Sequence, residues 1–242
     1  MNTLNNFLFI ALPYVALTVF LIGTIYRYKG TKFKFSSLSS QFLEGRKLFW
    51  GSVPFHWGLL FLFFGHLIAF LIPGTVIAWN SEPLRLIILE VSGFIFGLSV
   101  LVGMLNLFIR RNTNVRIRVV TSKMDLIIES LLIIQIILGL WIAYGFRWGS
   151  SWFAAVLTPY LWSIFTLNPN IDAVSSMPLV IQLHVSLAFV IFLLIPFTRL
   201  VHLLVPPLHY IWRPYQKVIW YWDRKKVRDP KSPWTVTKSQ NN

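Results

Sequence analysis

Five histidines are the side chains of this sequence that are best suited to metal or redox chemistry. They are His56, His66, His184, His202 and His209. Imidazole is a common ligand of iron, copper and zinc, and it can also relay protons. The chain has no cysteine, which excludes a cysteine-ligated iron–sulfur cluster, a covalently attached haem and a disulfide within it. Any redox iron held by this chain therefore needs histidine or methionine ligands.

The composition is that of a membrane protein. Of the 242 residues, 56% are apolar and only 12% are charged, whereas a soluble domain carries about 25% charged residues. The net charge of +14 resembles that of a nucleic-acid-binding protein. The basic residues, however, lie in short segments between long apolar runs, as they do in the loops of a membrane protein. We therefore expect a multi-pass protein of the cell membrane that contacts lipid and does not bind nucleic acid.

Five segments are long and apolar enough to cross a bilayer, which takes about 20 residues. They are residues 7–26, 54–72, 86–109, 125–145 and 179–205. The predicted fold is an all-α polytopic membrane helix bundle with five transmembrane helices. The first segment follows no basic residue, so we expect a retained helix rather than a cleaved signal peptide. Residues 1–220 form the predicted membrane domain, and residues 221–242 form a basic cytoplasmic tail.

The basic residues predict the orientation of the bundle. Nineteen of the 22 Lys and Arg residues lie in the first loop, the third loop and the C-terminal tail, whereas only Arg85 and Arg147 lie on the other side. Lys and Arg favour the cytoplasmic side. We therefore expect the N-terminus outside and the C-terminus in the cytoplasm. The long outer loop, residues 146–178, is rich in aromatic residues and is expected to lie at the membrane interface.

Four of the histidines form two pairs by their depth in the predicted bilayer. On the second span, His66 lies ten residues after His56 and so about 15 Å further out. The fifth span runs the other way, with His184 near its outer end and His202 near its cytoplasmic end. His56 and His202 form an inner pair, and His66 and His184 form an outer pair. Imidazoles that face each other from two helices suit a six-coordinate haem iron, so we predict two b haems.

The rise along the two helices does not match. Ten residues rise by about 15 Å, but the 18 residues from His184 to His202 rise by about 27 Å. We expect tilted helices and a bend at Pro196 to absorb this difference. His209 follows the fifth span and is expected at the surface rather than as a ligand.

Three short motifs resemble the gamma subunit of respiratory nitrate reductase. They are residues 64–66 (Phe-Gly-His), 183–184 (Leu-His) and 196–202 (Pro-Phe-Thr-Arg-Leu-Val-His). The histidine spacings, the five spans with an outer N-terminus, and Arg110-Arg111 at the end of the third span also fit that family. The likeness covers about residues 1–220, and the tail from residue 222 does not share it.

The resemblance implies a quinol-oxidising, di-haem cytochrome b. Such a subunit takes quinol from the membrane quinone pool, and it anchors an iron–sulfur subunit and a molybdenum catalytic subunit on the cytoplasmic face. The resemblance also implies the same histidine pairs as the depths do. A cytochrome b subunit of a sulfur-metabolism or heterodisulfide-reductase-like membrane complex remains an alternative.

Quinol is expected beside the outer pair. Gly65 and His66 would let its ring approach, and Arg85 is a candidate partner for a quinol oxygen or a haem propionate, or else an interfacial anchor. Glu90 is either an acceptor of quinol protons or a partner of Arg85.

The inner end carries further candidates. Arg199 lies within the fifth span, one turn before His202, and an arginine at such a depth needs a partner. A propionate of the inner haem is the expected one, and Arg110 and Arg111 could share this role. Asp125 and Glu129 could form a proton route, although pairing with nearby cations is favoured.

Two functions of other classes are also possible. Histidines within a membrane can relay protons in a transporter subunit, but that role does not require matched depths on two helices. A structural anchor with incidental histidines is disfavoured by the same four aligned positions. The reduced-minus-oxidised absorption spectrum separates both from a cytochrome.

Overall fold

The computed structural model describes residues 3–31 and 46–204, and these are helical with no strand among them. Five helices in this part of the chain are long and apolar enough to cross a membrane. They span Thr3–Gly30, Lys47–Leu71, Pro83–Thr113, Lys123–Gly145 and Leu179–Phe197. The five predicted spans are thus confirmed. The second, third and fourth helices begin before the predicted segments, because residues that flank an apolar stretch can continue its helix at the membrane surface.

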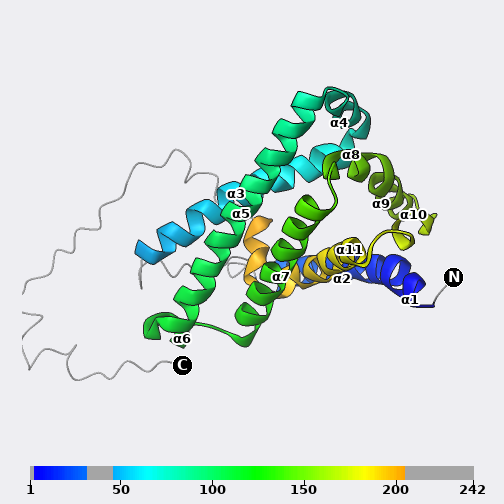
Figure 1. Ribbon diagram of the computed structural model, residues 1–242. Coiled ribbons are helices and arrows are strands. Elements are labelled where there is room, and N and C mark those ends of the chain that lie inside the picture. The colour runs from blue at the N-terminus through cyan, green and yellow to red at the C-terminus, as the bar shows by residue number, and fades with distance from the viewer. Residues whose placement is uncertain (1–2, 32–45, 205–242) are drawn as a thin grey trace, which may run out of the picture. The chain divides into compact units, whose positions relative to one another are not determined.

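Short helical segments join the second spanning helix to the third, the third to the fourth and the fourth to the fifth (Figure 1). The first half comprises α1 (Thr3–Asn6), the π-helical turn η1 (Phe7–Ala11), α2 (Leu12–Thr31), α3 (Arg46–Leu71), α4 (Pro73–Asn80), α5 (Pro83–Thr113) and α6 (Val115–Val119). The second half comprises α7 (Lys123–Gly145), α8 (Gly149–Trp152), the π-helical turn η3 (Phe153–Leu157), α9 (Thr158–Phe165), α10 (Asp172–Ser175), α11 (Leu179–Leu194) and the 3₁₀ helices η4 (Ile195–Phe197) and η5 (Arg199–Leu203). α3 packs along α5, α5 also packs on α7, and α11 packs along α2 and α7.

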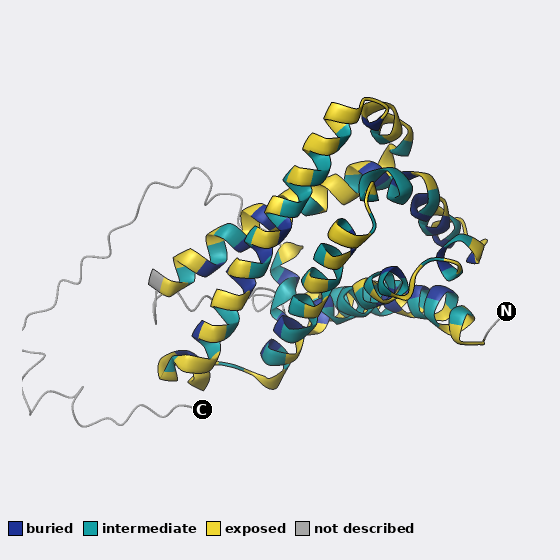
Figure 2. Cartoon of the chain, in the orientation of Figure 1, coloured by how far each residue is buried: buried dark blue, intermediate teal, exposed yellow. Residues whose placement is uncertain are grey.

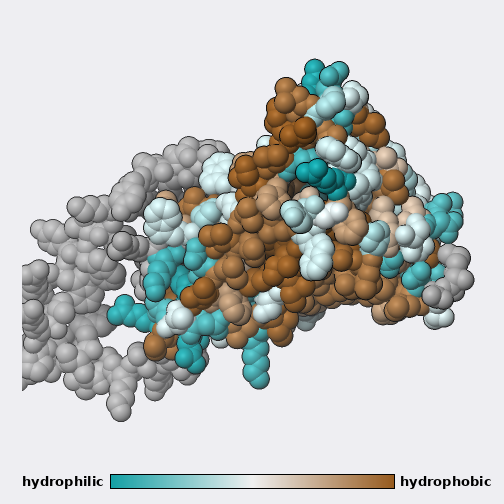
Figure 3. Space-filling view, in the orientation of Figure 1, coloured by the Kyte–Doolittle hydropathy of each residue, from teal (hydrophilic) through white to brown (hydrophobic). Residues whose placement is uncertain are grey.

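Apolar side chains cover much of the outside of these helices, as expected in lipid. Trp57, Ile88 and Trp141 are examples of large apolar side chains that are more than half exposed. Figure 2 shows exposed residues along the outward faces of α3, α5 and α7. In Figure 3 hydrophobic residues cover the middle of the visible face. In water such a surface would favour association, but in a bilayer it contacts acyl chains.

Glycines bring α3 and α5 into backbone contact. A Cβ atom placed on Gly103 of α5 would lie 2.6 Å from the Phe55 nitrogen and 2.7 Å from the Gly51 carbonyl oxygen. A Cβ on Gly58 of α3 would lie 2.8 Å from the Phe96 carbonyl oxygen. Small residues allow such close approach between helices in a membrane. One face of α3 is therefore packed closely against α5.

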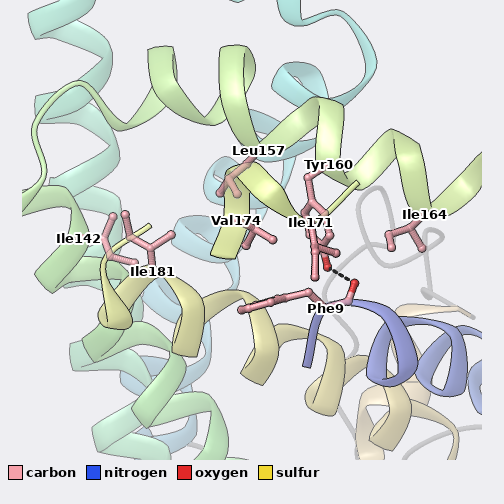
Figure 4. Packing of buried hydrophobic residues seen from close by; sticks show 8 residues of the cluster. All are labelled: Phe9, Ile142, Leu157, Tyr160, Ile164, Ile171, Val174 and Ile181. Carbon is pink, nitrogen blue, oxygen red and sulfur yellow. Dashed lines mark hydrogen bonds between the residues drawn. The ribbon is translucent and has the colours of Figure 1, made fainter. Parts of the chain in front are cut away.

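The end of the bundle opposite the basic loops has its own hydrophobic core (Figure 4). Phe9 of η1 packs there against Tyr160 of α9, and the Tyr160 hydroxyl donates a 2.9 Å hydrogen bond to the Phe9 carbonyl. Burial raises the pKa of Tyr160, so this hydroxyl stays a donor. Within the loop predicted to lie at the membrane interface, Tyr160 is 1% exposed whereas Trp162 is 43% exposed. The interfacial position of the loop stays a prediction.

We predict that Gly103→Ala destabilises the bundle by about 1–3 kcal/mol, because the new methyl group would overlap backbone atoms of α3. Thermal unfolding of the detergent-solubilised protein measures the effect. Gly93→Ala is the matched control on the same helix, since a Cβ there meets no atom within 4 Å. Equal unfolding temperatures for the two variants would contradict the proposed close packing.

Candidate functional site

The structure brings His56 and His202 together. Their ring centroids lie 6.1 Å apart with an angle of 56° between the ring planes. His56 lies on α3 and His202 on η5, so the pair joins two segments that are far apart in the sequence. Both lie at the end of the bundle that carries the basic loops, here called the basic end. The described basic residues at this end are Arg27, Lys29, Lys47, Arg110, Arg111, Arg116, Arg118 and Lys123.

Each ring of this pair is oriented by its own backbone. Nδ1 of His56 bonds the Ser52 carbonyl at 2.7 Å, and Nδ1 of His202 bonds the Arg199 carbonyl at 2.5 Å. Nε2 is thereby left as the nitrogen that can bind a metal. Histidines that bind metals usually donate their second N–H to a carbonyl or carboxylate in this way. The hydrogen bonds therefore match those of metal ligands.

The geometry of this pair fits a haem iron. Two imidazole nitrogens at about 2 Å from one metal, on opposite sides of it, place the ring centroids about 6 Å apart. The observed separation is 6.1 Å. Among the described residues, no three His, Asp or Glu side chains gather as a metal site. Each histidine pair thus offers two ligands, which is the number that haem takes from the protein in a six-coordinate complex.

The second predicted pair comprises His66 of α3 and His184 of α11. Nδ1 of His66 bonds the Leu62 carbonyl at 2.7 Å, and the ring packs edge-on against Phe153, with centroids 5.3 Å apart. His184, its predicted partner, lies on α11. Nδ1 of His184 is buried without a hydrogen-bond partner in the described part of the chain. His184 thus lacks the backbone hydrogen bond through Nδ1 that the other three paired histidines make.

The fifth span does not continue as one bent helix to residue 205, as the sequence suggested. α11 ends at Leu194, Thr198 has an extended backbone (φ −122°, ψ 180°), and η5 follows. Pro196 causes the interruption, since it lacks an N–H and its ring crowds the preceding turn. The calculated 27 Å rise assumed one straight helix. The interrupted segment instead turns the chain so that His202 reaches His56. We call residues 195–199 the elbow.

Two neighbouring helices hold the elbow. Nη1 of Arg27 on α2 donates to the carbonyls of Pro196 and Thr198 at 2.6 and 3.0 Å. Gly23 lies directly beneath, because a Cβ there would be 3.1 Å from the Pro196 Cβ. On the other side, Nε of Arg199 donates to Asp125 of α7 at 2.7 Å. The position of His202 thus depends on contacts from both α2 and α7.

Asp125 and Glu129 form a buried ion-pair network with arginines. Glu129 bonds Arg111 at 2.6 Å, and Asp125 lies 3.6 Å from the same guanidinium while it bonds Arg199. The sequence left open whether these carboxylates pair with cations, and the structure shows that they do. Arg110 is buried, at 3% exposed. A haem propionate as partner of Arg110, Arg111 or Arg199 stays a prediction.

Of the residues predicted to bind quinol, Gly65 and His66 lie on α3 and Arg85 lies on α5. Arg85, in the first turn of α5, lies 5.2 Å from the centre of the Trp79 ring. Gly65 is exposed, and a Cβ there would meet no atom within 4 Å. Glu90 does not pair with Arg85 among the described contacts. It accepts hydrogen bonds from the Ser150 nitrogen and hydroxyl at 3.0 and 2.7 Å. A quinol site at Gly65, His66 and Arg85 stays a prediction.

Sequence reasoning missed three contributors to the site. Gln135 of α7 contacts His184, Gly139 makes room for the His184 ring, and Arg27 holds the elbow. Gln135 had a signal, since an amide in the middle of an apolar span is unusual. Arg27 and Gly139 had none that distinguishes them from an ordinary loop cation and a packing glycine. His209 and the tail, residues 221–242, lie outside the described residues.

The fold and the paired histidines define a polytopic helical membrane protein with two candidate metal-binding pairs, and comparison with known proteins identifies the family. The family described as "Nitrate reductase gamma subunit" matches residues 5–221. The chain is 36% identical over 218 residues to the respiratory nitrate reductase 2 gamma chain of Escherichia coli (strain K12), covering 89% of this chain and 96% of that one. It is 34% identical over 212 residues to the nitrate reductase gamma chain of Bacillus subtilis (strain 168), covering 84% and 93%. The protein belongs to the nitrate reductase gamma subunit family.

We predict that Asp125→Asn loosens η5. Without the carboxylate charge Arg199 loses its ion pair, so amide hydrogen exchange in Arg199–Leu203 should accelerate about tenfold, or about 1.4 kcal/mol. We expect less than for a fully buried pair, because the Arg199 side chain is 31% exposed. Hydrogen–deuterium exchange with mass spectrometry measures this.

Two controls separate this effect from others. Glu129→Gln removes the same charge one turn further along α7, but the Glu129 ion pair is with Arg111 rather than Arg199. Ser122→Ala removes the helix cap that Asp125 shares without touching Arg199. Faster exchange of η5 in either control, to the same extent as in Asp125→Asn, would count against the Arg199 contact as the cause.

Proposed function

We propose that this chain is the quinol-oxidising, di-haem cytochrome b subunit of a respiratory nitrate reductase. His56 and His202 would ligate one haem, and His66 and His184 the other. The observation that carries the proposal is the His56–His202 pair, whose ring separation of 6.1 Å matches two ligands on one iron. When bound, haem supplies one-electron redox chemistry at these positions.

The protein contributes the orientation of the histidine rings. Nδ1 of His56, His66 and His202 is occupied by a backbone carbonyl, which fixes each ring and directs Nε2 away from its own helix. α3 packs on α5, while α11 packs on α2 and α7. α3 and α11 do not pack extensively on each other in the described part of the chain, which supports the accommodation of a large planar group between their histidines.

Partners are proposed from the relatives and from the charge pattern. The relatives are gamma chains of nitrate reductase, an oxidoreductase complex with further subunits. We place an iron–sulfur subunit and a molybdenum catalytic subunit against the basic end, on the cytoplasmic side. The chain has no cysteine for a cluster of its own, so electrons that leave the basic end need such an acceptor. The basic residues there offer electrostatic attraction to an acidic partner.

The orientation gives the reaction a direction. With the basic end in the cytoplasm, quinol oxidised near His66, Gly65 and Arg85 releases its two protons on the outer side. Its two electrons move inwards. Moving one charge through the membrane potential involves about 2.3 kcal/mol per 100 mV. Outer proton release with inward electron flow therefore stores energy without a proton pump.

We predict close to two b haems per chain, measured by pyridine haemochrome on the purified complex. Replacement of His66 or His184 by Ala should remove one and the same haem, and replacement of His56 or His202 the other. Each variant loses one of two axial ligands, so about half of the haem should disappear.

The pattern of loss is the decisive result. If His56 and His66 variants lost the same haem, the pairing between helices would be wrong. A wild-type value near zero would overturn the cytochrome assignment and favour the transporter or anchor function instead.

We also predict that Arg85→Ala weakens quinol oxidation while both haems stay bound. A guanidinium that donates to a quinol oxygen contributes a charge-assisted hydrogen bond, so its loss should lower quinol-dependent haem reduction about tenfold or more. Stopped-flow absorbance with a reduced quinol analogue measures the rate. Arg147→Ala is the matched control, since Arg147 is the other basic residue predicted at this side. An unchanged rate in Arg85→Ala would remove Arg85 from the quinol site.

A further inference from the structure

Three of the four paired histidines share a hydrogen bond that the fourth lacks. His56 and His66 each bond, through Nδ1, the carbonyl four residues earlier, and His202 bonds the carbonyl three residues earlier. His184 makes no such bond in the described part of the chain, and its Nδ1 is buried without a partner. Something other than its own helix must therefore orient this ring.

Gln135 of α7 is the side chain that contacts His184. Its Nε2 donates to the His184 carbonyl at 3.1 Å and lies 3.3 Å from the His184 Nε2. Its Oε1 is buried and has no hydrogen-bond partner among the described residues. The neighbouring turn of α7 makes room for the ring, because a Cβ on Gly139 would lie 3.1 Å from the His184 Cε1.

The two unpaired atoms are chemically complementary. An imidazole Nδ1–H is a donor, and an amide oxygen is an acceptor. Each atom left alone in a low-dielectric interior is energetically costly, so pairing them removes both costs. In the structure the amide Nε2 lies 3.3 Å from Nε2 of His184, so pairing Nδ1 with Oε1 requires a turn of the ring and of the amide. The same turn frees Nε2 of His184.

We propose that Gln135 is the positioning residue of His184, and that its Oε1 accepts a hydrogen bond from Nδ1 when Nε2 binds iron. The inference rests on the proposed function, since it takes His184 as a haem ligand. Gln135 thus does for His184 what a backbone carbonyl does for the other three histidines. It acts through the histidine and does not touch the iron.

This role has an electronic consequence that packing alone does not have. An acceptor on Nδ1 makes the imidazole a stronger electron donor to its metal, and hydrogen bonding of an axial ligand is one of the means by which a protein tunes a haem potential. Removal of the acceptor should raise the reduction potential of this haem. Replacement by an acceptor of equal or greater strength should keep or lower it.

The test is a spectroelectrochemical titration of the purified complex carrying Gln135→Leu or Gln135→Glu. The haem held by His66 and His184 is identified as the one that is absent from His66→Ala. In Gln135→Leu we expect about a tenfold change in its ratio of reduced to oxidised forms at a fixed potential, or about 59 mV towards higher potential. In Gln135→Glu the potential should stay or fall, and the haem held by His56 and His202 should be unaffected in both.

The matched control is Gln182→Leu. Gln182 is also an amide, and it lies on α11 two residues before His184, but it bonds the carbonyls of Ser175 and Met177. It should leave the potential of the same haem unchanged. A shift equal to that of Gln135→Leu would overturn the proposal, because any lost amide would then act alike.

Each remaining outcome either supports or overturns the proposed role of Gln135. Loss of this haem from Gln135→Leu but not from Gln135→Glu supports the proposal, since only Leu lacks an acceptor. Loss from both variants, an unchanged or lowered potential in Gln135→Leu, or equal shifts in both would overturn it. Absence of b haems from the wild-type complex would instead refute the proposed function itself, so the two failures are distinguishable.

Discussion

The interruption of α11 is the feature on which the arrangement at the basic end depends. Within a bilayer every backbone polar group has to be satisfied by the protein itself. Breaking a helix at Pro196 frees carbonyls that lipid cannot bond. Arg27 supplies the donors for two of them, at 2.6 and 3.0 Å. This one side chain makes the break tolerable, and the break is what turns His202 towards His56.

Ion pairs explain how Arg199 can lie within a segment that is otherwise apolar. A charge in such a position is costly unless it is paired. Arg111 and Arg199 are paired with Glu129 and Asp125, which are one turn apart on α7 and therefore on one face. The network ties α5, α7 and η5 together with little net charge.

Much of this arrangement could be predicted from the sequence, because spacing along a helix fixes depth. The five spans follow from apolar runs, and the approach of His56 to His202 follows from opposite helix directions. The elbow could not be predicted in the same way. Proline inside a span signals a disturbance, but whether the helix bends or ends depends on donors from other helices, here Arg27. Nor does the sequence show whether Asp125 or a haem carboxylate is the partner of Arg199.

The orientation of each histidine ring could not be predicted from the sequence either. Periodicity can place His66 and His184 at one depth, yet it says nothing about which ring nitrogen is engaged. That depends on single hydrogen bonds. Nδ1 bonds the histidine's own backbone in three cases, whereas in the fourth Nε2 of His184 lies 3.3 Å from the Gln135 amide of α7. Gln135 is separated from His184 by 49 residues, so no local motif connects them.

The two histidine pairs therefore differ in how they are held. Both rings of the basic-end pair are oriented by backbone carbonyls, which no side-chain substitution can delete. The other pair has one ring on a backbone carbonyl and one against an amide from a third helix. A backbone carbonyl is a fixed acceptor, whereas a side chain can be exchanged for a stronger or weaker one. In the pair that lies farther from the basic end, one ring therefore contacts a side chain that a single substitution can change.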